Sequence, residues 1–440
     1  MSSDIFAPGF KTTPYWWEAA EPAERPSDLP AETQVAVVGG GYAGLNAALT
    51  LARLGHDVTV LDAERIGWGA SSRSGGMVSG GMKLSLAEAR AAFGEEKAEE
   101  IAAACNASFP FIEELLTREG IDADYVRCGR FTAAWTPKHY SAQEAGAATL
   151  ARITGMPTRM LPKARQREAL GSDYYHGGMI AEASGSLHPA KYARGLAAAA
   201  ERAGVRLVDR ARVHSWKPEG SGWRLVTSRG EMRAAKILTS TNGYSLSPEG
   251  KTPNPWFARR MVPLASFIIA TEELDPALIE RLFPGKRMIG DTRRVLSYFR
   301  PSPDGKRVLY GGRVSFSPMK PEEAAPGLYR MMTSVFPELV GTKITHAWTG
   351  NVSFTFDGLR HIGEHEGVFY AGGCQGNGVA MASWIGHQVG LKIAGAANAP
   401  FALDGMPFPT RPLYRGNPNL VLPFVGNWYR LLDRLERMAA

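Results

Sequence analysis

Residues 34–62 read QVAVVGGGYAGLNAALTLARLGHDVTVLD, and this stretch decides the fold. The short apolar run at 34–38 is typical of a buried parallel strand. Apolar residues at helical spacing follow from Tyr42 to Leu54, Gly55 ends that helix, and 57–61 is the next strand. A strand, a helix and a second strand within about 30 residues form a β-α-β unit, which opens a doubly wound sheet.

The glycines between the first strand and the helix have the spacing of a dinucleotide-binding motif. Gly39, Gly41 and Gly44 supply G-x-G-x-x-G. The first glycine permits the tight turn, the second lets the backbone approach a pyrophosphate, and the third lets the helix pack on the strand. The helix N-terminus offers free N–H groups to phosphates. Asp62, 18 positions after Gly44, is suited to hydrogen-bond the ribose hydroxyls of an adenosine.

The segment after the second strand favours FAD over a nicotinamide cofactor. Residues 65–77 read RIGWGASSRSGGM, a small, hydroxyl-rich loop that carries Arg73. Such a loop is suited to wrap the far side of a pyrophosphate and to run toward an isoalloxazine ring. The sequence contains no second G-x-G-x-x-G, so we expect no separate nicotinamide-binding domain and rank a nicotinamide dehydrogenase last.

Residues 37–77 resemble the FAD-binding start of the D-amino acid oxidase, glycine oxidase and sarcosine oxidase superfamily, and most closely the gamma-glutamylputrescine oxidase-like flavoproteins. The likeness extends along nearly the whole chain. Matching stretches are Tyr15-Trp16, GSLHPAKY at 185–192, TNGY at 241–244, DTRR at 291–294 with Tyr298, GGR at 311–313, YAGGCQGNGV at 370–379 and WYRLLD at 428–433.

This resemblance implies which residues bind FAD. The ADP half would contact Gly39, Gly41, Tyr42, Ala43, Gly44, Asp62 and Ala63, with the backbone of Val213 at the adenine. The pyrophosphate would lie along Gly69, Ala70, Ser71, Ser72 and Arg73, and the flavin near Gly75, Gly76 and Met77. The last helix would aim its N-terminus at the flavin O2 position from Gly373, Gly376, Asn377, Gly378 and Val379.

The predicted fold is α/β, with a Rossmann-like, three-layer FAD-binding domain interleaved with a substrate domain built on an antiparallel sheet. We assign 1–30 to an N-terminal arm that docks through its aromatic rings. The FAD-binding domain takes 31–105, 181–250 and 345–395, the substrate domain 106–180 and 251–344, and a tail at 396–440 packs on the body.

Local patterns predict further elements along the chain. We expect helices in 86–118, 190–204 and 379–393, strands of a smaller sheet between 205 and 238, and strands at 261–271, 295–300 and 308–314. Residues 121–180 are mixed and less regular.

Two departures from the resembled family bear on the flavin. Sarcosine-oxidase-like members attach FAD to a cysteine upstream of the C-terminal glycine block, where this chain reads HAWTGN at 346–351, so we expect non-covalent FAD. Monomeric members carry a lysine over the flavin that promotes reaction with oxygen; its counterpart is not placed in this sequence, where the candidate region reads VLYGGR at 308–313. The electron acceptor, O2 or another molecule, therefore stays open.

The resemblance predicts oxidation of a primary or secondary amine, of the gamma-glutamylated amine or N-alkyl amino acid type. Hydride transfer to flavin N5 would give an imine that water hydrolyses, so the protein mainly positions its substrate. Tyr298 and Arg300 share one face of a strand, and Arg300 or Arg313 is a candidate anchor for a substrate carboxylate. The alternatives are an NAD(P)H-using flavin hydroxylase and a non-catalytic protein that retains FAD.

Composition excludes several other classes. The formal charge of +7 over 440 residues is mild and no nucleic-acid motif appears. The N-terminus lacks the pattern of a signal peptide, no run of 18 apolar residues spans a membrane, and three scattered cysteines fit the cytoplasm. HIGEH at 361–365 matches a zinc-peptidase pattern, but Gly358 and Gly363 favour a turn between strands, so we expect no metal. Cys374 is interpreted as a small packed residue.

Overall fold

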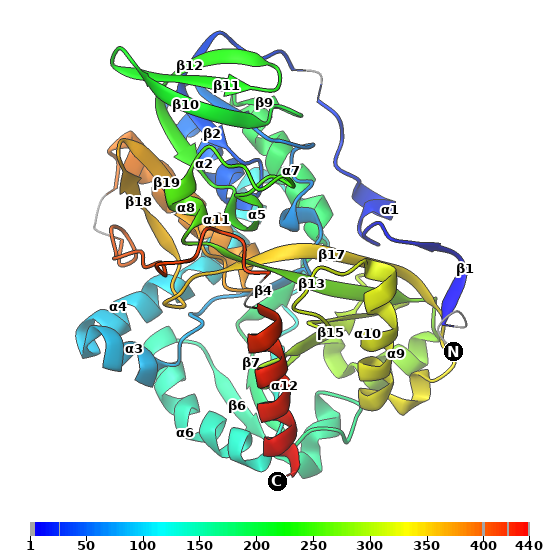
Figure 1. Ribbon diagram of the computed structural model, residues 1–440. Coiled ribbons are helices and arrows are strands. Elements are labelled where there is room, and N and C mark those ends of the chain that lie inside the picture. Colours follow the sequence, from blue (N-terminus) through cyan, green and yellow to red (C-terminus); the bar gives the residue numbers. More distant parts are fainter. Residues whose placement is uncertain (1–4, 26, 398–400, 420–421, 439–440) are drawn as a thin grey trace.

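The computed structural model describes residues 5–25, 27–397, 401–419 and 422–438, and within these residues the strands form two large sheets and one two-stranded pair (Figure 1). In the view of Figure 1 one large sheet occupies the upper half of the molecule and the other the lower half. The two-stranded pair, β4 (Met77–Ser79) with β8 (Ser184–Ser186), belongs to neither.

The upper sheet has eight strands in the described chain and is parallel at its centre. Its members are β10 (Val213–Glu219), β11 (Gly222–Thr227), β12 (Gly230–Thr239), β2 (Glu32–Val38), β3 (Val58–Leu61), β9 (Arg206–Val208), β18 (His361–His365) and β19 (Val368–Gly372). β2 lies between β3 and β12, parallel to both. With helix α2 (Tyr42–Arg53), strands β2 and β3 form the predicted β-α-β unit, so the Rossmann-like fold class is confirmed.

Four helices cover one face of the upper sheet: α2, α5 (Ser108–Glu119), α7 (Pro189–Arg202) and α11 (Gly378–Ala394) (Figure 1). Two of them, α2 and α11, pack very closely against each other. A Cβ at Gly386 of α11 would come within 2.2 Å of the Ala43 carbonyl oxygen in α2, and one at Gly390 within 3.0 Å of the Ala47 oxygen. Only residues without side chains let the two backbones approach in this way.

The lower sheet has nine strands in the described chain and is mainly antiparallel, as predicted. In order they are β1 (Phe6–Lys11), β17 (Ile344–Phe354), β13 (Val262–Thr271), β16 (Val308–Gly312), β15 (Ser297–Pro301), β14 (Met288–Asp291), β5 (Arg130–Ala133), β7 (Gly178–Ala181) and β6 (Thr158–Leu161). Helix α10 (Pro321–Val335) packs on β13, β16 and β17. A second apolar core fills this half, where Phe299 stacks on Tyr310 with ring centroids 5.0 Å apart.

The remaining helices are shorter or lie at the periphery. They are α1 (Trp17–Ala20), α3 (Leu86–Phe93), α4 (Glu95–Asn106), α6 (Pro137–Thr154), α8 (Pro255–Ala258), α9 (Pro276–Leu282) and α12 (Leu422–Met438). In the described part of the chain, none is both long and apolar enough to cross a membrane.

Three expectations need correction. The strands after 205 were predicted to form a smaller sheet, but β9 pairs with β3 and β12 with β2 in the upper sheet. Strand β17 falls within the segment 345–395 that was expected in the upper half with the FAD-binding domain, but it is hydrogen-bonded in the lower sheet. The irregular region 121–180 contains an 18-residue helix, α6, which begins at the cap Thr136 and Pro137. The division into domains itself stays a prediction.

The N-terminal arm crosses from one half to the other. β1 pairs with β17 in the lower sheet, and Trp16 is fully buried in a cluster with Trp348. Residues after Trp17 then run along α7 of the upper half. The arm therefore contacts both halves, and the buried indole of Trp16 anchors it to the body.

The space available for a Cβ predicts opposite effects of two glycine-to-alanine substitutions, one in the contact between α2 and α11 and one in exposed helix α6. Gly386→Ala places a Cβ against backbone that cannot move aside, and we expect it to destabilise the protein by about 1–3 kcal/mol. Gly146→Ala, in exposed helix α6 with nothing within 4 Å of its Cβ, should be neutral or stabilising by up to about 1 kcal/mol. Thermal and urea unfolding of both variants measure this, and equal effects would contradict the packing argument.

Candidate cofactor and substrate site

The glycine turn after β2 has room only for glycine at two positions. Gly39 has φ +111°, a conformation that side chains rarely allow. A Cβ at Gly44 would lie 1.9 Å from the Gly39 carbonyl oxygen. Gly41 immediately precedes α2, and its Cβ would meet Ser71 Oγ at 3.0 Å. The first turn of α2 therefore presents bare backbone beside Gly41, the geometry that an approaching pyrophosphate requires.

Asp62 lies directly after β3 and holds the glycine turn. Its carboxylate accepts hydrogen bonds from the Gly40 N–H at 2.7 Å and from the Glu64 N–H at 2.9 Å. The second bond closes a tight turn around Ala63. Burial raises the pKa of Asp62 to about 6, although both bonds act in the opposite direction. The Asp62 carbonyl accepts from the Ala211 N–H at 2.7 Å, which brings the chain leading into Val213 to the same edge of the sheet.

Residues 70–80 connect the N-termini of two helices. Ser71 Oγ accepts from the Tyr42 N–H at 3.0 Å, at the start of α2. At the other end, Asn377, which precedes α11, donates from Nδ2 to the Gly80 carbonyl at 3.0 Å. The segment thus runs from one positive helix end to the other, past Gly75 and Met77, along the line that an elongated dinucleotide would follow.

Four successive carbonyls of this segment are held by donors from distant parts of the chain. Trp348 Nε1 donates to the Arg73 carbonyl and Trp16 Nε1 to the Ser74 carbonyl, both at 2.8 Å. Arg300 Nη1 donates to Gly75 at 3.4 Å and to Gly76 at 3.2 Å. Because these carbonyls are fixed, the backbone of the segment is held in one conformation before any ligand binds.

Arg300 therefore has other partners than the predicted substrate carboxylate. Its Nη1 also donates to the Leu187 carbonyl at 2.9 Å and its Nε to the Pro301 carbonyl at 3.0 Å, and the residue is 4% exposed. At Gly76, with φ +66°, a Cβ would lie 2.1 Å from the same Leu187 oxygen. With its Nε and Nη1 bonded to backbone carbonyls, Arg300 is suited to position the loop at 75–76.

Arg73 also has unexpected neighbours. Its guanidinium lies between the rings of Trp68 and Trp17, at 4.1 and 4.6 Å from their centroids, and donates to the Trp68 carbonyl at 2.8 Å. Trp17 Nε1 donates to Ser72 Oγ at 3.0 Å. The stacking fixes the arm over the loop, and the contact of Arg73 with the pyrophosphate stays a prediction.

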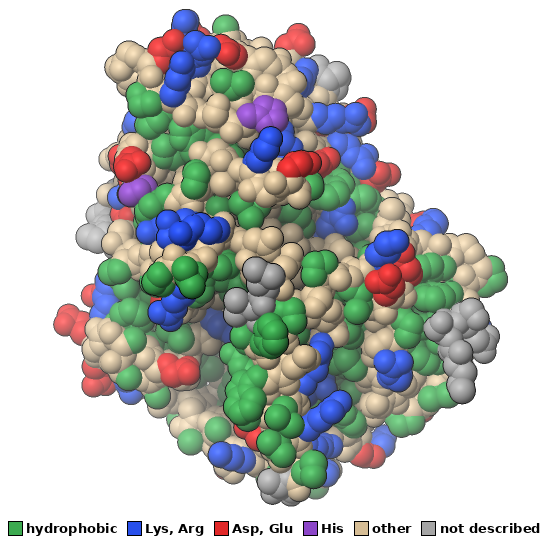
Figure 2. Space-filling view, in the orientation of Figure 1, with side chains coloured by type: hydrophobic (Ala, Val, Ile, Leu, Met, Phe, Trp, Pro, Cys, Tyr) green, Lys and Arg blue, Asp and Glu red, His purple; other side chains and the backbone are tan. Residues whose placement is uncertain are grey.

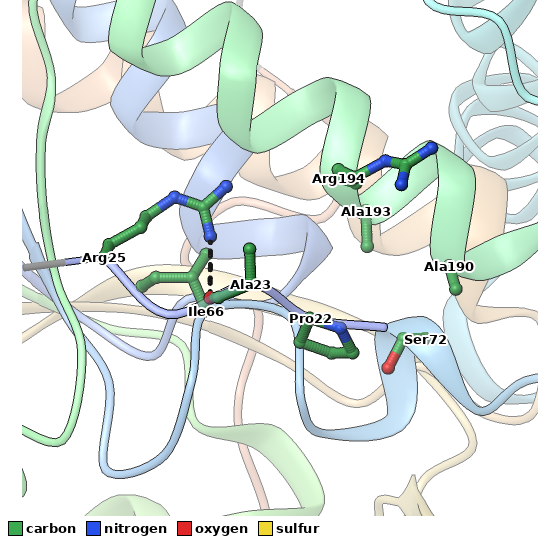
Figure 3. Close-up of a pocket in the computed structure, with 8 residues that line it drawn as sticks. All are labelled: Pro22, Ala23, Arg25, Ile66, Ser72, Ala190, Ala193 and Arg194. Carbon is green, nitrogen blue, oxygen red and sulfur yellow. Dashed lines mark hydrogen bonds between the residues drawn. The ribbon is translucent and has the colours of Figure 1, made fainter. Parts of the chain in front are cut away.

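The arm closes the loop from outside and leaves little space beneath it. Figure 3 shows Pro22, Ala23 and Arg25 of the arm facing Ile66 and Ser72, with Ala190, Ala193 and Arg194 of α7 behind. The cavity that these residues line is about 10 Å³, room for one water. This cavity is too small for a cofactor, so it marks a seam between arm, loop and helix.

The C-terminal glycine block forms the turn between β19 and α11. Gly373, Gln375 and Gly376 all have positive φ, and Asn377 precedes Gly378 and the buried Val379 at the helix start. Asn377 Oδ1 also accepts from Ser79 Oγ at 3.3 Å. This strained turn aims the α11 N-terminus at β4, so the predicted flavin residues around 77 and 377 are brought together. Cys374 is buried beneath it, as interpreted.

Tyr298 lies against the loop on the side of the lower sheet. A Cβ at Gly75 would be 3.1 Å from the Tyr298 ring, and one at Gly311 only 2.3 Å from it. The hydroxyl is within 2.9 Å of Ser266 Oγ. Burial raises the pKa of Tyr298, which keeps the phenol neutral at physiological pH. The ring thus faces the predicted flavin segment from the expected strand.

Arg313 belongs to a group of cations that sequence reasoning largely missed. Its guanidinium lies 4.7 Å from the Phe354 ring centroid, and burial lowers its pKa to about 10. Burial lowers the pKa of Lys83, and repulsion by Arg313, Arg130 and Arg360 lowers it further. No ion pair joins any of these four residues to a carboxylate among the residues that the structure describes.

Two of these arginines carry unsatisfied buried donors. Arg130 Nε and Arg360 Nε and Nη1 have no hydrogen-bond partner in the described part of the chain, and Arg360 is 1% exposed. Unpaired buried guanidinium nitrogens are costly. No local motif distinguishes these residues, because they come from β5 and from the turn before β18 and meet only in the fold.

A larger cavity, of about 430 Å³, opens beside Arg313 between the lower sheet, α10 and α12. Among the described residues that line it, the cations are Arg293, Arg313, Arg330, Arg430 and Arg434, and the one acid is Asp433. The cavity is therefore strongly positive, and it is large enough for a small organic anion.

The HIGEH stretch at 361–365 is strand β18, neither a zinc-binding helix nor the predicted turn. The ring of His361 stacks on Phe408 at 3.9 Å, and its Nε2 lies 3.1 Å from an Asp357 carboxylate oxygen. Along the described residues, no group of histidine, cysteine and carboxylate side chains is arranged to hold a metal ion.

The site fits FAD on the observations above. Backbone free of side chains lies at Gly41, an acidic acceptor at Asp62, and two helix N-termini at the ends of one fixed loop. Sequence reasoning missed the residues that hold this loop, above all Trp348 and Leu187, since they lie more than 100 positions away.

Comparisons with known proteins agree with this fit. Residues 34–390 match the DAO family model, described as FAD dependent oxidoreductase. The chain is 30% identical to a probable oxidoreductase OrdL of Rhizobium meliloti, over 97% of this chain and 98% of the relative. It is also 30% identical to the gamma-glutamylputrescine oxidoreductase of Escherichia coli, over 91% and 93%. The glycine oxidase structure from Geobacillus kaustophilus superposes with TM-score 0.70 at 22% identity, covering 87% and 99%.

The raised pKa of Asp62 predicts how FAD binding depends on pH. Ribose hydroxyls donate to an ionised carboxylate, so protonation of Asp62 should weaken binding as the pH falls below about 6. One linked proton gives at most about a tenfold rise in Kd per pH unit. Titration of the FAD-free protein with FAD between about pH 5 and pH 8 measures this.

Asp62→Asn is the matched control. It should bind FAD more weakly at neutral pH and lose the pH dependence below 6. An unchanged slope in this variant would assign the titration to another group.

Proposed function

Because the chain belongs to the family of FAD-dependent oxidoreductases, we propose that it oxidises a primary or secondary amine. The family match covers most of the chain, and a relative at 30% identity is named for oxidation of gamma-glutamylputrescine, which is an amine. The observation that supports the proposal is the buried, positively charged site beside the fixed loop, where Tyr298 lies against Gly75 and Arg313 is close enough to Tyr298 and Cys374 to interact with them electrostatically.

FAD, held without a covalent bond, supplies the hydride acceptor at flavin N5. The residues of this chain bind and orient it. The α2 N-terminus and Ser71 would hold the pyrophosphate, Asp62 the ribose, and the α11 N-terminus the pyrimidine edge of the ring. Positive helix ends stabilise negative charge that develops nearby, so α11 favours the reduced, anionic form.

Arg313 is our candidate for binding a substrate carboxylate. Arg300 already bonds backbone carbonyls through its Nε and Nη1, whereas Arg313 has no ion-pair partner among the described residues and borders the positive cavity. Tyr298, buried and neutral, would cover the substrate side of Gly75. The substrate amine must be neutral to release hydride, and a site rich in cations lowers the pKa of a bound ammonium group.

The positive surroundings favour an amine that carries a carboxylate. The unpaired donors of Arg130 and Arg360, together with Lys83, add positive charge beyond what one carboxylate balances. Both substrate types expected from the sequence, a gamma-glutamylated amine and an N-alkyl amino acid, carry such a group. Water then hydrolyses the imine product to a carbonyl compound and an amine.

Two other functions make different predictions. An NAD(P)H-using flavin hydroxylase would show rapid reduction of its flavin by NADPH, and a protein that merely retains FAD would show no reduction by any amine. Within the described residues the three cysteines are buried and unpaired, so we propose a cytoplasmic location.

The function is tested by the visible spectrum of the purified holoenzyme without oxygen. Amines with a carboxylate should bleach the flavin bands, and amines without one should do so only at much higher concentration. Admission of air then separates an oxidase, which recovers its colour at once, from a dehydrogenase. Bleaching by NADPH alone would favour the hydroxylase, and no bleaching by any amine would contradict amine oxidation.

Substitution of the two arginines should separate their roles. Arg313→Met removes charge-assisted hydrogen bonds to the substrate carboxylate, so KM for a carboxylated amine should rise by about 10- to 150-fold with FAD content unchanged. KM for an amine without a carboxylate is the internal control and should change little.

Arg300→Met should behave in the opposite way. It frees the carbonyls of Gly76 and Leu187, so the purified protein should hold less FAD and melt at a lower temperature. If Arg300→Met instead raised KM selectively for carboxylated amines, Arg300 would be the anchor.

A further inference from the structure

Helix α12 exposes a continuous apolar stripe to solvent. Phe424, Trp428, Leu431, Leu435 and Met438 follow each other at intervals of four and three residues, which puts them on one face. They are 77%, 57%, 46%, 50% and 83% exposed. Figure 2 shows hydrophobic side chains gathered over the position that α12 takes in Figure 1. A contiguous exposed patch of this kind marks an interaction site.

The opposite, inward face of α12 is fixed to the body by polar groups as well as by packing of Leu422 and Gly426 near Phe316. The Asp433 carboxylate accepts from the backbone N–H groups of Arg294 at 3.2 Å and Val295 at 3.0 Å. Arg437 donates to the carbonyls of Trp135 at 2.6 Å and Tyr174 at 2.8 Å. These bonds fix which face of the helix looks outward, so the exposure of the apolar stripe is a property of the fold.

Positive charge accompanies the stripe. Arg434 lies beside Leu431 and Leu435 and is exposed, whereas the acids of the helix are engaged inward: Asp433 is 6% exposed and Glu436 pairs with Arg294 at 2.7 Å. Exposed Leu413, in the segment before the helix, stands between Arg411 and Arg415. That segment also lies at the front of the view in Figure 1.

The charge pattern argues against pairing with a second copy of this chain. A two-fold pair would bring each Arg434 toward the α12 surface of the other copy, where α12 has no unpaired carboxylate to form an ion pair with it. The stripe also covers only about two heptads, short of the three or four that a coiled coil needs.

We propose that this face binds the surface of an anionic phospholipid bilayer. Large aromatic and aliphatic side chains on one side of a helix, with arginines beside them, are suited to lie in the boundary between headgroups and acyl chains. Trp428 and Tyr429 are the residue types that favour this depth, and Arg434 would meet lipid phosphates. The helix lies along the surface and does not cross it.

Docking in this way would set the substrate cavity beside the bilayer. Arg430, Asp433 and Arg434 of α12 line the cavity of about 430 Å³ that borders Arg313. A peripheral contact through α12 thus couples membrane binding to the wall of the proposed substrate site, and it stands independently of which amine is oxidised.

Co-sedimentation of the holoenzyme with vesicles tests the proposal. The protein should bind phosphatidylcholine vesicles that contain about 30% phosphatidylglycerol and should bind pure phosphatidylcholine vesicles much more weakly, with release at about 0.5 M salt. Trp428→Ser with Leu431→Ser should abolish binding, since each loses apolar area from the stripe, and Arg434→Gln should weaken it by about fivefold. FAD content should not change in either variant.

Val340→Ser is the matched control, because Val340 is 70% exposed but lies outside α12. It should bind vesicles as the unaltered protein does. Absence of binding to the anionic vesicles would overturn the proposal. So would a wild-type dimer in light scattering that becomes monomeric in the Trp428→Ser, Leu431→Ser variant, since the stripe would then be an interface between copies.

Discussion

The first turn of α2 touches the end of β2, and the rest of the site depends on that contact. A Cβ at Gly44 would come within 1.9 Å of the Gly39 carbonyl, so only glycine allows the helix to start there. On its other side α2 meets α11, where Gly386 lies against Ala43. These two close approaches fix both helix N-termini in one rigid unit, which gives the positive helix ends constant positions relative to each other.

The loop at 70–80 turns this rigid unit into a site by joining it to the other half of the molecule. Its ends are bonded to the starts of α2 and α11, while its middle carbonyls accept from Trp16, Trp348 and Arg300. A loop without such donors would have to become ordered when FAD binds, at a cost in conformational entropy. Here the protein has met that cost during folding, so binding energy is available for recognition of the ligand.

Local chemistry determined what could be predicted. The β-α-β unit and its glycines lie within one short stretch, and each role follows from a turn or a helix start, so β2, α2 and β3 were predicted closely. Strand β9 joins the upper sheet because it pairs with β3, about 145 positions earlier in the chain. The three residues of β9 do not indicate which strand will be their partner. Helix α6 was missed because Ala, Gly and Thr blur its apolar periodicity.

The arginines show the limit of prediction from residue type. Arg73, Arg300 and Arg313 offer the same planar donor group, and a sequence pattern suits each of them to an anion. Contacts within the fold divide their roles: two indoles stack on Arg73, Arg300 bonds four backbone carbonyls, and Arg313 keeps its charge without a carboxylate partner in the described chain. Since a guanidinium already bonded to backbone gains little from a substrate, the unpaired one has the most binding energy to offer, and specificity follows from this difference.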